Sequence, residues 1–361
     1  MTITKAASTT DTARTAYLVL GMHRSGTSAV SQLLALAGAN LPRNVMAGDE
    51  HNAKGYFEPW KIAILNDSRL RAAGAAWDDV FAFPFKPLPR KDERIWLNRA
   101  ATLFAEEYGA LAFPLLKDPR VAVLMPFWRE VLADLDVTAR CVIPVRHPLA
   151  VEGSLSRRNG FAPEKSALLW SAYMLAAEAY TRDLPRAFVG YDALLADWRA
   201  EVARIETAHG AALPNLTERA GKAIDRFLTP DLRHNAAGDG LSELGWAGEL
   251  TGRVLAWFEA AAKGHAPDPA ALDLAARDLA RRGAEVGVLV SPVTRDLDAA
   301  RAELLDLRQH IAFEREQVSR ETAAELAAHR AQVKRLETEI EALRREAADA
   351  VFHLDAALAD R

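Results

Sequence analysis

Cysteine is almost absent from this sequence. Cys141 is the one cysteine in 361 residues, which excludes an intrachain disulfide framework and favours a cytoplasmic location. It lies in an apolar run, where a cysteine is usually a small buried residue rather than a nucleophile. The nine histidines form no His-x-x-x-His or His-Glu-x-x-His spacing, so no metal site is predicted.

Excess positive charge and long apolar runs are also missing. The formal net charge is −4, which argues against general binding to nucleic acid or to an anionic membrane surface. Any site for an anionic ligand therefore has to be local. No apolar stretch is long enough to cross a bilayer, so no transmembrane segment is predicted. Residues 1–15 are rich in Thr, Ala and Ser without the apolar core of a signal peptide, and we expect them to be disordered.

Short apolar runs alternate with helical patterns in the first two thirds of the chain. Strands are predicted at 17–20, 114–117, 140–145 and 186–190, and helices at 29–37, 123–132, 149–157, 164–182 and 192–207. Strands that alternate with helices pair in parallel through right-handed crossovers. The sequence therefore predicts an α/β fold, a P-loop-type three-layer sandwich with a central parallel sheet. Ligands of such sheets gather beyond the carboxyl ends of the strands.

The domain that contains this sheet is expected to span residues 16–290. Within it, residues 40–110 are less regular and rich in proline near residue 85, and they are interpreted as an insertion with its own helices, able to cover the site. Residues 215–290 are expected to form the helical C-terminal part of this domain.

The character of the chain changes at about residue 295, where glycine and proline disappear. Apolar residues then recur in steps of three and four, at 304, 307, 311 and 318, and again from 326 through 333, 336 and 340 to 357. This spacing is typical of a coiled coil, predicted here as one long C-terminal helix over 295–361. The step from Val318 to Leu326 is eight, so the repeat skips one residue there. This stripe of apolar residues indicates a homo-oligomer or a partner helix. The alternative is one long solvated helix that folds back on the domain.

The most informative stretch is residues 17–28. An apolar run of strand length leads into a polar loop with two glycines, and a helical pattern follows. This layout directs backbone N–H groups and a helix N-terminus at a phosphate. The candidate binding residues of the loop are His23, Arg24, Ser25, Gly26, Thr27 and Ser28. The loop nearly matches G-x-x-x-x-G-K-[ST], but Thr27 stands where the lysine belongs and the basic residue comes earlier, at Arg24. The alternative is an incidental glycine turn.

A second candidate for phosphate binding follows the third predicted strand. Arg146 stands at the strand end, Pro148 suits the first turn of a helix, and Ser154 lies about two turns into that helix. An arginine fork and a hydroxyl that converge in this way suit a terminal phosphate. His147 is assigned to local packing. The alternative is a strand-end arginine paired with a carboxylate, beside an ordinary helical serine.

Together these motifs resemble the sulfotransferase family, which uses 3′-phosphoadenosine 5′-phosphosulfate (PAPS) as donor. The run 24–28 resembles the family's 5′-phosphosulfate loop, and Arg146 with Ser154 resembles its 3′-phosphate motif. Further resemblance lies in 52–58, 115–120 and 188–195, so that about residues 15–235 are covered. Because the loop carries Arg24 and not lysine, the bacterial, Golgi-like carbohydrate branch fits best.

The resemblance implies roles for individual residues. Arg24 would stabilise the leaving oxygen, and Lys117 would neutralise the sulfuryl oxygens. Glu58 is the first choice for the base that takes the acceptor proton, and His51 is the second. The alternatives are that Glu58 caps the following helix and that His51 is a surface residue. The implied acceptor is a hydroxylated molecule, a saccharide or glycolipid, and the implied co-substrate is PAPS without a metal.

Two other functions stay open at this point. A P-loop kinase or NTPase requires the missing lysine and a carboxylate for Mg²⁺, for which Asp118 is the only near candidate. A noncatalytic nucleotide-binding scaffold, carried on the coiled coil, would keep the donor site without turnover.

Overall fold

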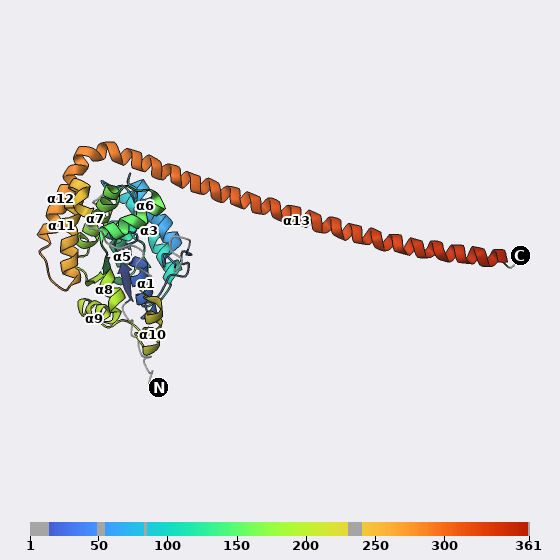
Figure 1. The fold of residues 1–361 in the computed structure, drawn as a ribbon, viewed down its shortest axis with the longest axis horizontal. Coiled ribbons are helices and arrows are strands. Elements are labelled where there is room, and N and C mark those ends of the chain that lie inside the picture. Colours follow the sequence, from blue (N-terminus) through green and yellow to red (C-terminus); the bar gives the residue numbers. More distant parts are fainter. Residues whose placement is uncertain (1–13, 49–54, 83–84, 230–239, 360–361) are drawn as a thin grey trace, which may run out of the picture. The chain divides into compact units, whose positions relative to one another are not determined.

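The computed structural model describes residues 14–48, 55–82, 85–229 and 240–359 (Figure 1). The chain divides into two compact units, the first ending at Arg295 and the second beginning at Asp296. The two units are described separately. His51 lies outside the described residues.

The first unit is built on a four-stranded parallel sheet with strand order β2-β1-β3-β4. The strands are β1 (Arg14–Val19), β2 (Leu115–Lys117), β3 (Val137–Val145) and β4 (Arg186–Gly190). All four predicted strands are present. The prediction that residues 1–15 are disordered is wrong for the last two, because Arg14 and Thr15 pair with Val137 and Thr138 at the start of β1 and β3.

Helices connect and cover the strands. They are α1 (Thr27–Leu36), α2 (Trp60–Ala72), α3 (Arg90–Tyr108), α4 (Arg120–Val123), α5 (Met125–Asp134), α6 (Pro148–Asn159), α7 (Pro163–Ala179), α8 (Tyr191–Ala196), α9 (Trp198–His209), α10 (Glu218–Phe227), η2 (Gly240–Leu244), α11 (Gly245–Ala262), α12 (Ala270–Arg282), η3 (Gly283–Gly287) and α13 (Val288–Ala359). The predicted helix 192–207 is two helices, because Asp197 takes an extended conformation and its side chain caps α9 by accepting from the amides of Arg199 and Ala200.

Alternate residues of the strands face two separate cores. Tyr17 and Val19 pack with α1, α9 and α10 on one face of the sheet. Leu18 and Leu20 belong to the other core, which includes side chains of α3, α5, α7 and α11. A sheet that is buried on both faces is the middle layer of three. The predicted α/β three-layer sandwich is confirmed.

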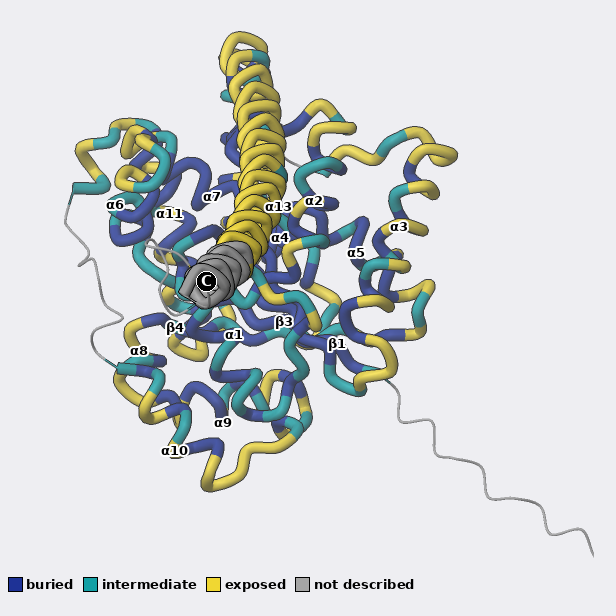
Figure 2. The backbone as a smooth tube through the Cα atoms, turned by 90° about the vertical axis from the view of Figure 1, so that its right-hand side faces the viewer, coloured by how far each residue is buried: buried dark blue, intermediate teal, exposed yellow. Residues whose placement is uncertain are grey.

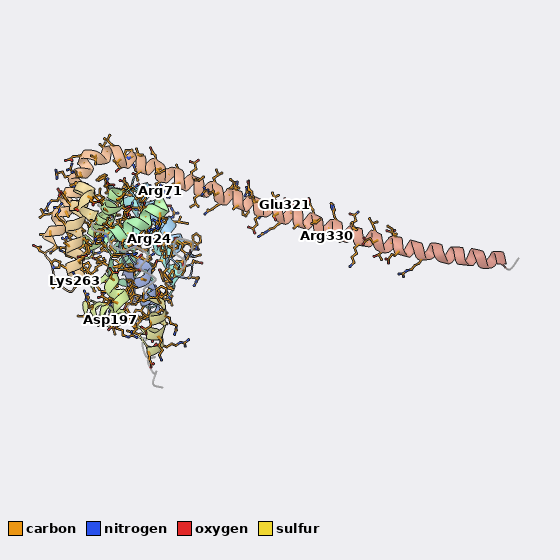
Figure 3. All side chains as sticks on the ribbon, in the orientation of Figure 1. Arg24, Arg71, Asp197, Lys263, Glu321 and Arg330 are labelled. Carbon is orange, nitrogen blue, oxygen red and sulfur yellow. The ribbon has the colours of Figure 1, made fainter. Side chains whose placement is uncertain are left out.

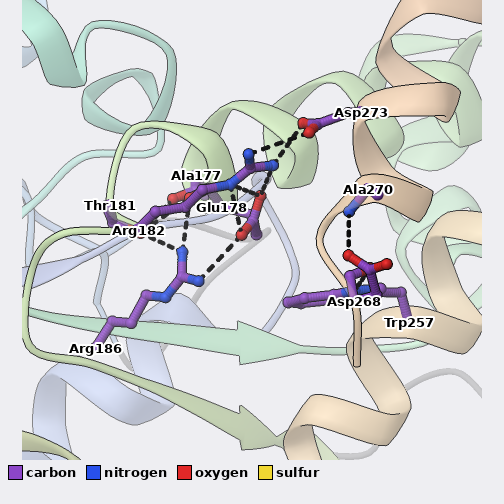
Figure 4. Close-up of polar contacts among 9 residues, drawn as sticks. All are labelled: Ala177, Glu178, Thr181, Arg182, Arg186, Trp257, Asp268, Ala270 and Asp273. Carbon is purple, nitrogen blue, oxygen red and sulfur yellow. Dashed lines mark hydrogen bonds and ion pairs between the residues drawn. The ribbon is translucent and has the colours of Figure 1, made fainter. Parts of the chain in front are cut away.

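A buried carboxylate fixes the α7 side of this layer (Figure 4). Glu178 is fully buried and accepts hydrogen bonds from two arginines, Arg182 and Arg186. Arg182 also bonds Asp273 of α12 at 2.6 Å. Because a buried charge is stable only when it is paired, this network ties α7, the start of β4 and α12 together.

The second unit is the continuation of α13. Its apolar seam residues, among them Leu307 and Leu336, are about half exposed, and Figure 2 shows the exposed character of the helix along most of its described length. The predicted long C-terminal helix is therefore present, whereas its pairing with another helix stays a prediction. Among the described residues, no helix combines the length and apolar character that crossing a membrane requires.

Candidate anion-binding site at the carboxyl end of the sheet

The loop after β1 has the backbone of an anion cradle. Gly26 caps α1 in the left-handed region, with φ of 90°, and no side chain caps the amides of the first turn. Arg24 also has a positive φ, 69°, which costs energy in a residue with a side chain. Strain of this kind persists where the surroundings fix it. The first-turn N–H groups of a helix without a side-chain cap are suited to bind an anion.

Gly26 is required at its position for two reasons. Besides the positive φ, a Cβ there would lie 2.3 Å from Cδ2 of Tyr191. Tyr191 follows β4, is buried, and carries the Arg146 guanidinium over its ring at 4.5 Å. The Tyr191 ring therefore packs against both Gly26 of the loop after β1 and the guanidinium of Arg146.

The two motifs are also joined by hydrogen bonds. Arg24 Nε donates to Ser154 Oγ at 2.5 Å, and Arg146 Nη1 donates to the carbonyl of Arg24 at 3.0 Å. Pro148 occupies the first turn of α6 as predicted, and Ser154 is buried within that helix. The structure thus brings Arg24, Arg146 and Ser154 into one site at the carboxyl ends of β1 and β3.

Hydroxyl groups line the same loop. Ser25 is fully buried, and its Oγ has no hydrogen-bond partner among the described residues. Because a buried hydroxyl without a partner is costly, its position suits a ligand oxygen. Thr27 is buried at the start of α1, and its carbonyl accepts from Ser31. Ser28 donates to the carbonyl of Tyr56 at 3.5 Å.

Tyr56 links the loop to a buried ion pair. Its carbonyl also accepts a 3.0 Å hydrogen bond from Lys117 Nζ, and Lys117 forms an ion pair with Glu58. Both side chains are at most 5% exposed. Burial raises the pKa of Glu58, while the Lys117 charge opposes that rise. Glu58 does not cap α2, whose cap residue Pro59 has no side-chain hydrogen bond.

The surroundings of the loop are electropositive. Burial, followed by the charges of Arg158, Arg120, Lys117 and Arg24, lowers the pKa of His23 well below 6.5. His23 is therefore neutral at pH 7. Two of these four cations, Lys117 and Arg120, are paired with carboxylates, and the other two, Arg24 and Arg158, suit an anionic ligand.

Two contributors were not found from the sequence. In the sequence, Tyr191 is only part of a late strand and helix start. A single sequence does not reveal its contact with Gly26, which lies 165 residues away. Arg158 lies one helical turn after Ser154, a spacing that puts both on one face, and this was the missed signal. Arg158 stacks over Trp77 at 5.7 Å, and Trp77 packs edge-on against His23 at 4.9 Å.

The segment that carries Trp77 is held by the end of the first unit. Ser291 donates to Asp79 at 2.8 Å, and Arg295 donates to the carbonyl of Gly74 at 3.2 Å. Tyr173 of α7 donates to the carbonyl of Trp77 at 2.8 Å. Part of the predicted 40–110 insertion therefore contacts the loop after β1. His147 serves locally, since its Nδ1 accepts from the amide of Leu149 at the start of α6.

The carboxylate considered for Mg²⁺ is already engaged. Asp118 is fully buried, one oxygen accepts from Asn66 at 2.6 Å, and the other accepts from Arg120 at 2.8 Å. A carboxylate held in this way serves the packing of α2 against the β2–α4 connection. Within the described ranges, no group of three or more His, Cys, Asp or Glu side chains is arranged to hold a metal ion. That no metal takes part stays a prediction.

Comparison with known proteins gives a distant likeness. No protein-family model and no curated protein matches the chain. Among solved structures the chain is similar to the sulfotransferase domain from the Synechococcus PCC 7002 olefin synthase, at 16% sequence identity and a TM-score of 0.37, covering 78% of this chain and 98% of that one. A likeness this distant says nothing of activity or substrate, which have to be argued from the residues.

Proposed function

We propose that the chain is a sulfotransferase that moves a sulfuryl group from PAPS to an acceptor hydroxyl or amine. The observation that carries this proposal is the junction of Arg24 with both Ser154 and Arg146. A nucleotide with phosphate groups at both the 5′ and the 3′ position needs two anion sites at a fixed separation. The proposal is supported by two groups of candidate donors in one site, both of which pack against the Tyr191 ring.

The donor fits the residues present. The amides of the α1 start and the Ser25 hydroxyl would hold the 5′-phosphosulfate, in the manner of other helix N-termini. Arg146 and Ser154 would hold the 3′-phosphate through a fork and a hydroxyl. Thr27 in place of a lysine then agrees with a donor that has no triphosphate tail.

The transfer needs charge stabilisation on two sides and a base. The bond between sulfur and the bridging oxygen of the phosphosulfate breaks, and a bond from sulfur to the acceptor oxygen forms. Arg24 would stabilise the charge that grows on the leaving phosphate oxygen, and Lys117 the sulfuryl oxygens. Glu58, paired with Lys117, would accept the acceptor proton, with His51 as the second candidate.

The acceptor class is proposed on chemical grounds. Trp77 is partly exposed next to His23, and an aromatic face beside a transfer site suits a sugar ring. We therefore propose a saccharide or glycolipid acceptor and a bacterial, cytoplasmic enzyme of the carbohydrate branch.

A labelled-donor assay tests this function. The full chain is incubated with ³⁵S-labelled PAPS and a panel of cell-envelope glycans and glycolipids. We expect label transfer to at least one acceptor, and a decrease of about 100-fold or more in Arg24→Ala, as for the loss of one charge-stabilising donor. Arg199→Ala removes an arginine that stacks on Trp198 in α9 and serves as the matched control. Binding of the donor without transfer to any acceptor would identify a noncatalytic scaffold instead.

A further inference from the structure

The second unit carries an apolar seam that no described residue covers. The seam consists of Leu304, Leu307, Ile311, Val318, Leu326, Val333, Leu336 and Ile340, each 40% to 61% exposed. A contiguous exposed apolar stripe of this length marks an interaction surface. We propose that residues 304–340 bind a second copy of this chain as a parallel, in-register, two-stranded coiled coil.

The residue types of the seam specify two strands. In heptad notation Leu304 and Leu307 occupy positions a and d, and the assignment resumes after the skip with Val333 at a and Leu336 at d. Position a is filled mainly by β-branched residues, namely Ile311, Val318, Val333 and Ile340. Position d is leucine at 307 and 336 and is polar at Glu314 and His329. β-branched residues at a with leucine at d favour a dimer over a trimer or tetramer.

The charges that flank the seam specify the parallel orientation. In a parallel in-register pair, each g residue meets the e residue five positions later in the other helix. Glu303 then meets Arg308, and Glu325 meets Arg330. Arg330 and Glu321 project from the helix in Figure 3. An antiparallel pair would instead bring g residues together and e residues together, apposing glutamates with glutamates and arginines with arginines.

Two irregularities favour a second copy over an unrelated helix. Glu314 occupies position d and is paired with His310 of its own helix at 3.2 Å. In-register pairing sets each polar d residue, Glu314 and His329 among them, opposite its own copy, whereas a shift by one heptad opposes Glu314 to Leu307 and His329 to Leu336. The eight-residue step from Val318 to Leu326 would put a partner with an unbroken heptad repeat out of step. A second copy carries the same step at the same height.

Cysteine crosslinking of the full chain tests orientation and register. Cys141 is buried, so the wild type provides a background without accessible thiols among the described residues. Under mild oxidation, Leu307→Cys and Leu336→Cys are each expected to form a disulfide-linked dimer. Arg335→Cys, at an outward position, is the control and is expected to stay uncrosslinked. In any antiparallel pair, at most one of the two seam positions faces its own copy. If the antiparallel pair is centred midway between them, a mixture of the two variants crosslinks instead.

Sedimentation equilibrium of the same protein measures the oligomeric state. We expect a dimer for the wild type, and a dissociation constant raised about 100-fold or more in Leu336→Asp, which buries a charge in the seam. Glu314→Leu is expected to tighten the dimer about tenfold or more, because it removes a polar layer. A monomer at all concentrations, a trimer or tetramer, or crosslinking only in the mixture of variants would overturn the proposal. These readouts need no donor and do not depend on the proposed activity.

Discussion

Arg24 Nε lies 2.5 Å from Ser154 Oγ, although the two residues are 130 positions apart in the chain. Arg24 belongs to the loop that leads into helix α1, and Ser154 belongs to helix α6. The contact means that Arg24 of the loop after β1 and the hydroxyl of Ser154 face the same point. Under the proposed function, a bound nucleotide would replace this mutual hydrogen bond, with Arg24 turning to the 5′-phosphosulfate and Ser154 to the 3′-phosphate.

Removing the hydroxyl of Ser154 tests that arrangement. We expect Ser154→Ala to weaken binding of 3′-phosphoadenosine 5′-phosphate about tenfold, because one hydrogen bond to a charged group is lost, equivalent to about 1.4 kcal/mol. Binding of adenosine 5′-monophosphate, which has no 3′-phosphate, should not change. Titration calorimetry measures both affinities. An equal loss for the two nucleotides would assign Ser154 to general loop structure.

The close approach of Gly26 to Tyr191 predicts a large effect of a single methyl group. Gly26→Ala should destabilise the fold by about 3 kcal/mol or more, since it combines a strained positive φ with overpacking against the tyrosine ring. The matched control is Gly210→Ala, where φ is also positive, 62°, but no atom lies within 4 Å of the added Cβ. The control should cost about 1–2 kcal/mol. Urea denaturation compares the two, and similar losses would contradict the role given to Tyr191.

The buried pair of Lys117 and Glu58 predicts a pattern of non-additive stability. Lys117→Met leaves the Glu58 carboxylate buried alone and should lower the free energy of unfolding by about 3–5 kcal/mol. The double variant Lys117→Met with Glu58→Leu removes both charges and should recover most of that loss. Urea unfolding of these two variants and of Glu58→Leu alone completes the cycle. Additive losses would mean that the two side chains are not coupled.

The raised pKa of Glu58 predicts a pH dependence of activity. As the base, Glu58 acts only when ionised, so kcat/KM should fall on acidification through a pKa above the ordinary 4.5 of a glutamate. Glu58→Gln should have low activity without this acid limb. Folding has the opposite dependence, because a raised pKa contributes stability that is present below the unfolded pKa and lost as the pH rises through the folded one. An acid limb that survives in Glu58→Gln would point to another base.

Local patterns in the sequence predicted the sheet and the loop well. Alternating apolar runs located all four strands, and glycines with Pro148 marked where helices begin. These signals are local, so a single sequence carries them. The breaks at Leu124 and Asp197 were missed because each lies within an otherwise continuous helical pattern, and a side-chain cap decides the second.

The long-range contacts of the site were beyond prediction from local pattern. The ring of Tyr191 against Gly26, and the position of Trp77 beside His23, depend on how β4 and the α2–α3 connection pack against the phosphate loop. Tyrosine and tryptophan are equally common in apolar cores. Only the assembled fold therefore distinguishes a residue of the site from a residue of the core. The family resemblance assigns Glu58 and Lys117 to one site in different roles, as the base and as the group that neutralises the sulfuryl oxygens. It does not predict the ion pair that joins them.

The most direct test of the account is a calorimetric titration with 3′-phosphoadenosine 5′-phosphate. Wild type and the control Arg199→Ala should bind this nucleotide with one site per chain. Arg146→Ala should bind it at least about 100-fold more weakly, because the variant loses an arginine fork at a partly buried phosphate. The absence of binding to the wild type, or unchanged affinity in Arg146→Ala, would contradict the assignment of the two motifs to one doubly phosphorylated nucleotide.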